Sequence, residues 1–141
     1  MPNQKIFASP QDAEAAFYEA LERGDIDTMM TIWAEDEEVV CVHPGGPRLI
    51  GYTMIREAWQ RIFANNKKLQ VRLSQQKTVT TPFAVISTLL EHIASPDDGT
   101  LSTPVAATNV YVRGTLGWRM VAHHASPVPP NSVGEEPRIL H

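Results

Sequence analysis

The last long apolar run of the chain reads Thr108-Asn-Val-Tyr-Val-Arg-Gly-Thr-Leu-Gly-Trp-Arg-Met-Val-Ala-His-His-Ala-Ser126. Its β-branched and aromatic residues predict two strands, and Gly114-Thr115-Leu116-Gly117 predicts the turn between them. The second strand ends in two histidines and a serine. Polar, titratable groups at the end of a strand need water or a pocket to receive them.

Three further strands precede this pair. A period of two begins at Leu69 and is broken at Thr81-Pro82, and the next strand is predicted from Phe83 to Ile93. The short β-branched run from Val39 to Val42 predicts another strand, followed by a dense turn at His43-Pro-Gly-Gly-Pro47. The pair described above then covers residues 105–113 and 118–126.

Helices are predicted in the first half of the chain. Ser9 and Pro10 are typical of a helix start, and Gly24 is typical of a helix end. Asp25 predicts the cap of a shorter second helix, which ends near Trp33. A third helix is predicted over residues 53–65, where apolar residues recur at helical spacing.

This order predicts an α+β fold, because helices followed by strands pack as one layer on another. We expect three N-terminal helices in the concave face of a strongly curved, mostly antiparallel sheet, which together form a cone. Residues 1–126 are predicted to be a single domain. Residues 127–141, rich in proline, are predicted to be an extended or disordered tail.

Composition narrows the class of protein. The 141 residues include 43% hydrophobic and 20% charged residues, which fits one globular domain. A net charge of −4 with scattered basic residues disfavours a nucleic-acid-binding protein. The single cysteine, Cys41, fits a reducing compartment. Without a signal-like start or an apolar run near the ~18 residues of a membrane helix, the chain is predicted to be soluble, cytoplasmic and free of membrane contact.

Three segments resemble the SnoaL-like group of the nuclear transport factor 2-like superfamily. They are Gly24-Asp25-Ile26-Asp27 with Ile32-Trp33-Ala34-Glu35-Asp36, then Gly51 with Ile55-Arg56, Trp59 and Phe63, and last Gly117-Trp118-Arg119-Met120-Val121 with His123-His124-Ala125-Ser126. They are similar to the group's second helix, third helix and last strand. The resemblance implies a conical pocket and a homodimer through the outer sheet face. It leaves the use of the pocket open, because this fold serves isomerases, cyclases, dehydratases and binding proteins.

The ketosteroid isomerase-like members of this superfamily use a carboxylate base and two hydrogen-bond donors that stabilise an oxyanion. Matching on Gly24-Asp25 places the tyrosine donor at Phe17, which has no hydroxyl. Tyr18 lies about 100° further around the helix and is expected to face elsewhere, although it is kept among the candidate ligand contacts. The second donor falls at Asn109.

The family's base position matches His43, or Cys41 because the loop is two residues longer. With all three roles altered, steroid isomerisation by that mechanism is not expected. His43 is a candidate general base near neutral pH, and Asn109 is a candidate donor to a ligand oxygen. A turn histidine and a cross-strand hydrogen bond are the structural alternatives, and a buried inert thiol is expected at Cys41.

Adjacent strand residues face opposite ways, so His123 and His124 cannot both reach one pocket. A regular hairpin that pairs Arg113 with Trp118 would place His124 on the face of Asn109. This predicts His124 as the third catalytic candidate and places His123 on the outer or dimer surface. A single β-bulge would reverse the assignment.

The remaining candidate ligand contacts are apolar or aromatic side chains: Met30, Trp33, Trp59 and Tyr111. For Met30, Trp33 and Trp59, core packing is the structural alternative. A metal site from His43, a strand histidine and Glu91 has no recognisable ligand spacing, so no metal and no cofactor are predicted. The leading hypothesis is a dimer that binds a small, partly apolar molecule and acts as an isomerase, cyclase or hydrolase. The alternatives are a non-catalytic binding scaffold and an assembly module that resembles the calcium/calmodulin-dependent kinase II association domain.

Overall fold

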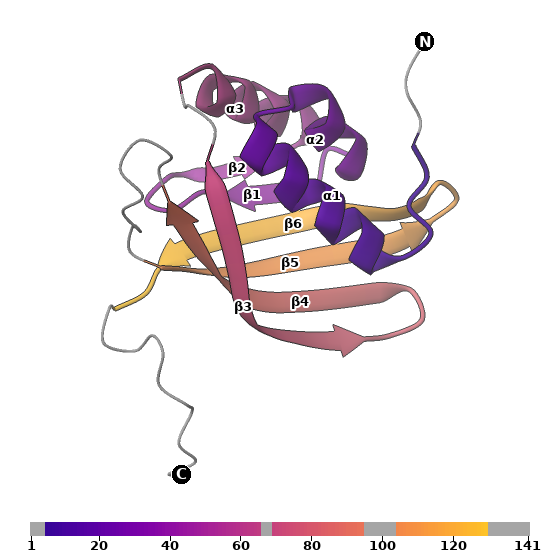
Figure 1. Ribbon diagram of the computed structural model, residues 1–141. Helices are drawn as coiled ribbons and strands as arrows, with labels where there is room; N and C mark the ends of the chain where they lie inside the picture. Colours follow the sequence, from indigo (N-terminus) through magenta and orange to yellow (C-terminus); the bar gives the residue numbers. More distant parts are fainter. Residues whose placement is uncertain (1–4, 66–68, 95–103, 130–141) are drawn as a thin grey trace, which may run out of the picture.

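The structure is a computed structural model that describes residues 5–65, 69–94 and 104–129. Its elements follow in the order α1 (Pro10–Arg23), α2 (Ile26–Ile32), β1 (Val40–Val42), β2 (Arg48–Ile50), α3 (Tyr52–Asn65), β3 (Gln70–Thr80), β4 (Ala84–Ala94), β5 (Val105–Gly114) and β6 (Gly117–Pro127). The three helices gather on one side of a single sheet (Figure 1). The predicted α+β class and helix-then-strand order are confirmed.

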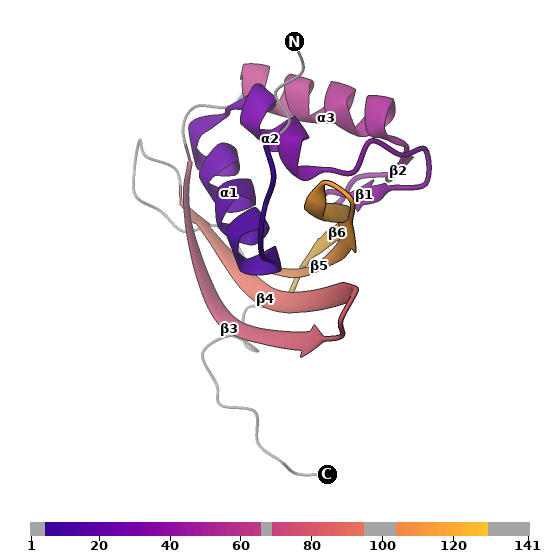
Figure 2. The same ribbon diagram turned by 90° about the vertical axis from the view of Figure 1, so that its right-hand side faces the viewer.

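The sheet has the strand order β2-β1-β6-β5-β4-β3. Strands β3 to β6 form an antiparallel meander, and β1 joins its edge by parallel pairing with β6. The sheet bends strongly around α1, so that β3 and β4 curve beneath the helix (Figure 2). This curvature encloses an interior between the helices and the concave face.

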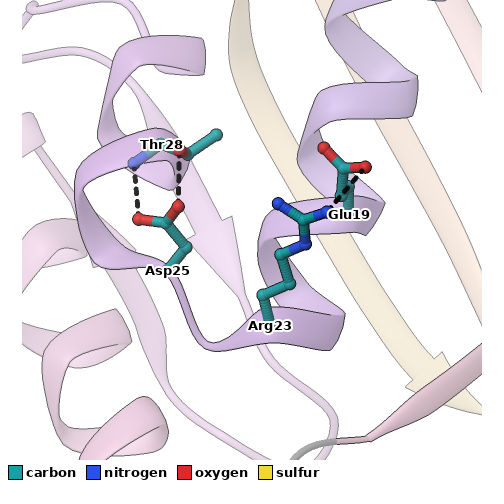
Figure 3. Close-up of polar contacts among 4 residues, drawn as sticks. All are labelled: Glu19, Arg23, Asp25 and Thr28. Atoms are coloured by element: carbon teal, nitrogen blue, oxygen red, sulfur yellow. Dashed lines mark hydrogen bonds and ion pairs between the residues drawn. The ribbon is translucent and has the colours of Figure 1, made fainter.

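The junction of α1 and α2 shows why the first helix ends where it does. Gly24 adopts φ +66°, a left-handed conformation that costs glycine little. Asp25 then caps α2 by accepting from the Thr28 N–H at 3.1 Å and the Thr28 hydroxyl at 2.7 Å (Figure 3). The nearby pair of Glu19 and Arg23, at 3.6 Å, lies on the exposed face of α1.

The N-terminal segment closes one end of the core. Phe7 is buried and forms a parallel bridge with Gly117, and its carbonyl accepts from the Trp118 N–H at 2.9 Å. A Cβ at residue 117 would lie 2.6 Å from the Phe7 oxygen, and φ there is +84°. Only glycine therefore permits both the β5–β6 turn and this close approach.

Two details differ from the sequence-based expectations. Strand β2, which forms a hairpin with β1, was not predicted, because three residues between two turns carry no periodicity. The β5–β6 register shifts between Val110 and Tyr111, which is the bulge that a regular hairpin excludes. The part of the predicted tail beyond Pro129 lies outside the described residues. No helix in the described part of the chain is long and apolar enough to cross a membrane.

Candidate functional site

A cluster of polar side chains is buried in the otherwise apolar interior. It comprises Glu14 and Tyr18 from α1, Ser87 and Glu91 from β4, Asn109 and Tyr111 from β5, and His123 from β6. The strands supply these groups because alternate residues face the helices: Val85, Ser87, Leu89 and Glu91 are all buried on one face of β4. We call this set the interior polar network.

Glu14 is the hub of the interior polar network. Its Oε2 accepts from Tyr111 at 2.8 Å and from Asn109 Nδ2 at 3.0 Å, and its Oε1 accepts from the Ser87 hydroxyl at 3.0 Å. Gln76, beside the bulge of β3, also donates to Oε1. Four donors fill the acceptor positions of an ionised carboxylate. They compensate a buried charge that no described Lys or Arg neutralises by an ion pair.

Glu91 is the second buried carboxyl group of the network. Its Oε2 accepts from the Tyr18 hydroxyl at 2.6 Å. Burial raises the pKa of Glu91, the Tyr18 hydrogen bond lowers it in part, and the charge of Glu14 raises it further. Burial and the carboxylate of Glu91 likewise raise the pKa of Tyr18, so this phenol keeps its proton.

Asn109 connects both carboxyl groups to His123. Its Nδ2 donates to Glu14 and to the Tyr18 oxygen, each at 3.0 Å. Its Oδ1 lies 2.6 Å from His123 Nδ1. The amide, which is fully buried, therefore has every polar atom engaged inside the protein. Asn109 was predicted to donate to a ligand oxygen from the interior. It does lie in the interior, but its amide is not free for direct contact with a ligand.

Beyond His123 the interior changes from polar to aromatic. The rings of Phe17, His43 and Trp59 surround the imidazole of His123 at centroid distances of 4.9, 6.4 and 6.3 Å. His43 stands edge-on to Trp59 at 4.5 Å. We call these four residues the ring cluster; α1, α3, β6 and the loop after β1 each supply one member.

Trp59 brings an unpartnered donor to the ring cluster. Its indole Nε1–H is buried and has no hydrogen-bond partner among the described residues, a property it shares with Trp33. A buried N–H without an acceptor costs free energy, and most such groups in folded proteins are satisfied. A ligand oxygen beside Trp59 would supply the missing acceptor.

Both histidines of the ring cluster are held neutral. Burial lowers the pKa of His43 below its ordinary value. Burial, with the neighbouring His43 and His124, lowers the pKa of His123 to about 3. Near pH 7 each imidazole therefore has one ring nitrogen that carries no hydrogen and can accept a hydrogen bond.

Cys41 occupies the other possible base position but is unsuited to that role. It is fully buried, and burial raises the pKa of its thiol to about 12. Its Sγ lies 3.5 Å from His43 Nε2. A protonated, enclosed thiol is a poor nucleophile.

The predicted orientation of the two strand histidines is wrong. Asn109 pairs with His123, which is 3% exposed, whereas His124 pairs with Thr108 on the outer face and is exposed. The bulge after Val110 adds one residue to β6 and exchanges the faces of the two side chains.

Other predicted contacts are placed as follows. Tyr18 faces inward, against the expectation that it would face elsewhere, because α1 packs between α2 and the sheet, so that Phe17 and Tyr18 are both buried. Tyr111 belongs to the interior polar network. Met30 and Trp33 are buried in the apolar core, which was the stated alternative for them. Trp59 belongs to the ring cluster.

Sequence reasoning missed Glu14 and gave Glu91 only a minor role. Glu14 precedes Tyr18 by one helical turn and so lies on the buried stripe of α1. Glu91 shares its strand face with Leu89. The sequence signal that could have found them is an acidic residue within an apolar helical stripe, for Glu14, and an acidic residue on the inward face of a strand, for Glu91. Among the described residues, no group of three or more His, Cys, Asp or Glu side chains has a geometry that could hold a metal ion.

Comparison with known proteins is consistent with this architecture. A solved structure from Thiobacillus denitrificans, provisionally assigned as a calcium/calmodulin-dependent protein kinase type II association domain, is 36% identical, covers 89% of this chain and 99% of its own, and gives a TM-score of 0.80. A protein from Streptomyces avermitilis, provisionally assigned as a dehydratase of the NTF2-like family, is also 36% identical over 82% of this chain and 91% of its own, with a TM-score of 0.73.

More distant matches agree on the fold. An NTF2-like protein of unknown function from Pseudomonas putida shares 17% identity, covers 86% of this chain and 87% of its own, and gives a TM-score of 0.76. The F-box protein SKIP8 of Arabidopsis thaliana is 24% identical over 111 residues, which is 78% of this chain and 46% of that protein. The SnoaL-like domain pattern matches residues 11–130. The chain therefore belongs to the SnoaL-like domain family of the nuclear transport factor 2-like superfamily.

Proposed function

We propose that the protein binds a small, uncharged, partly apolar molecule at the ring cluster and transfers a proton on it without a cofactor, as a dehydratase, isomerase or cyclase does. The observation that carries this proposal is the pair of neutral histidines beside the unpartnered indole N–H of Trp59. A proton acceptor and a hydrogen-bond donor within one aromatic enclosure are the minimum for general acid–base chemistry.

In this proposal His43 is the base. It is half-buried, whereas His123 is enclosed, so His43 is the more accessible of the two imidazoles. Its lowered pKa keeps it unprotonated near neutral pH and ready to accept a proton. The indole N–H of Trp59 would donate to the substrate oxygen that gains negative charge. The provisional assignment of the Streptomyces relative as a dehydratase favours this class of reaction.

The charge of the interior selects the substrate. An anion beside the interior polar network would approach Glu14 and Glu91, and no described Lys or Arg pairs with either of them. Repulsion by buried carboxyl groups is only weakly screened. Hydroxylated aromatic or alicyclic molecules are therefore preferred over carboxylates and phosphates.

Thermal-shift measurements with hydroxylated aromatics, cyclic alcohols and matched carboxylates test this proposal. We expect uncharged members to raise the melting temperature, and His43→Ala to weaken binding about tenfold, as the loss of one hydrogen bond and its ring contacts implies. His124→Ala is the matched control, because it deletes an exposed histidine of the opposite face. Equal binding by the two variants, or a preference for carboxylates, would contradict the proposal.

A second proposal concerns assembly. The outer face of the sheet carries one apolar residue from every strand in a single cross-strand row: Ile50, Val40, Ala122, Val110, Ile86 and Val79. Ile86 is 40% exposed and Val79 is 61% exposed. A continuous apolar row on a sheet is typical of a protein interface. We propose that it pairs two copies of the chain, and the association-domain assignment of the Thiobacillus relative favours such assembly.

Light scattering coupled to size exclusion tests the assembly. The wild type should elute as a dimer or a larger ring, and Ile86→Lys should weaken association at least tenfold by placing a charge in the apolar row. Met54→Lys on α3 introduces the same charge at a residue that is 48% exposed, and should leave the assembly intact. A monomeric wild type at micromolar concentration would exclude this interface.

A further inference from the structure

The donors and acceptors of the interior polar network can each be assigned from the hydrogen bonds that its members form. Glu14 is already an acceptor for Tyr111 and Ser87, so the Asn109 atom beside it must be the NH₂ group. The same NH₂ group donates to the Tyr18 oxygen, whose own proton is used toward Glu91. Two independent acceptors therefore fix the orientation of the Asn109 amide.

The fixed amide determines where the proton of His123 lies. With NH₂ turned to Glu14, the Asn109 carbonyl oxygen faces His123 Nδ1 at 2.6 Å. A carbonyl oxygen cannot donate, so Nδ1 must carry the hydrogen. A neutral imidazole has one N–H, and Nε2 is then left with its lone pair.

We infer that Asn109 is a positioning residue, which holds His123 as the Nδ1–H tautomer and makes its Nε2 a hydrogen-bond acceptor for a ligand hydroxyl or N–H group. The ligand in this inference is the one of the proposed function, on which this part of the inference rests. The inference adds a requirement that the ring cluster alone does not impose on the ligand. His123 selects a ligand that donates a hydrogen bond at this point, and a ligand with only an ether or carbonyl oxygen there leaves Nε2 unpaired.

The groups that face His123 support a neutral ring. His43 lies across the ring cluster, His124 is the next residue of β6, and both disfavour a positive charge on His123. The rings of Phe17 and Trp59 lie beside it at centroid distances of 4.9 and 6.3 Å and carry no charge. Asn109 joins the carboxylate of Glu14 to His123 through one hydrogen bond to each.

Nitrogen-15 NMR of the histidine rings in the unliganded wild type tests the tautomer directly. We expect His123 to show a protonated Nδ1 and an unprotonated Nε2 at neutral pH. Asn109→Leu removes the acceptor and should abolish the preference, whereas Asn109→Asp, whose oxygen still accepts, should keep the proton on Nδ1. His124→Asn assigns the neighbouring signals and should leave the pattern unchanged. A protonated Nε2 in the wild type would overturn the inference, even if both Asn109 variants failed to fold.

A matched pair of probes separates this inference from the proposed function. Phenol donates a hydrogen bond that anisole, its methyl ether, lacks. We expect phenol to bind the wild type about fivefold or more tightly than anisole, the loss that one hydrogen bond implies. Equal affinity would overturn the specificity. If the Nδ1–H tautomer is found but no probe or member of the ligand panel binds, the proposed function fails while the positioning role of Asn109 stands.

Discussion

Replacing Glu14 with leucine is expected to lower the free energy of unfolding by about 3–5 kcal/mol, the range found when one partner of a buried charged network is removed. The substitution deletes the acceptor of Asn109, Tyr111, Ser87 and Gln76 at once. Buried donors that lose their acceptor keep their full desolvation cost. Urea unfolding at pH 7 measures the change.

Glu19→Leu is the matched control for this prediction. Glu19 lies on the same helix, but it is exposed and forms an ion pair with Arg23 at 3.6 Å (Figure 3). Exposed pairs contribute little, so its replacement should change the free energy of unfolding by less than about 1 kcal/mol. Similar losses for both variants would show that Glu14 is not the hub of the interior.

Acid is expected to destabilise the protein through His123. Its pKa is lowered from 6.5 to about 3 in the folded chain. Between these pH values His123 is therefore protonated in the unfolded chain and unprotonated in the folded chain. The stabilisation is therefore present above pH 6.5 and is lost as the pH falls toward 3. One proton corresponds to about 1.4 kcal/mol per pH unit, or roughly 3 kcal/mol between pH 6.5 and pH 4.

The His123→Asn variant isolates this contribution, because an asparagine amide can still donate to Asn109 but does not titrate. The wild type should lose roughly 3 kcal/mol more than the variant over that interval, measured by urea unfolding at each pH. Glu91 acts in the opposite direction, since its raised pKa makes its contribution to the free energy of unfolding increase as the pH falls. Both proteins contain Glu91, so this contribution cancels in the comparison. His124→Asn should keep most of the loss attributed to His123, because burial is the main cause of the lowered pKa of His123. Parallel profiles for wild type and His123→Asn would show that His123 is not buried in the neutral form.

The elements of the fold were predictable because their signals are local. The helical spacing from Ile55 to Trp59 and the strand alternation after Leu69 each lie within one window of sequence. Strand β2 escaped prediction because three residues are too few to show a period, and it exists only through its pairing with β1.

The candidate site was predictable only in part, because its geometry depends on long-range pairing. Asn109, His43 and Trp59 could be named from the sequence. The choice between His123 and His124 depends on one bulge, which alternation cannot reveal. The role of Glu14 depends on its hydrogen bonds to Ser87 of β4 and Asn109 of β5. The sequence of its own helix does not indicate these partners.

The closure of Phe7 against Gly117 has a consequence for how the chain reaches its native state. This bridge joins the first described segment to the last hairpin. Strand β1 likewise gains its second neighbouring strand only when β6 is present. The partners of Glu14 are likewise 62 to 97 residues away in sequence. Such a high contact order delays folding until distant segments meet. During synthesis, therefore, Glu14 cannot form its hydrogen bonds to Asn109 and Tyr111 until the β5 segment has left the ribosome.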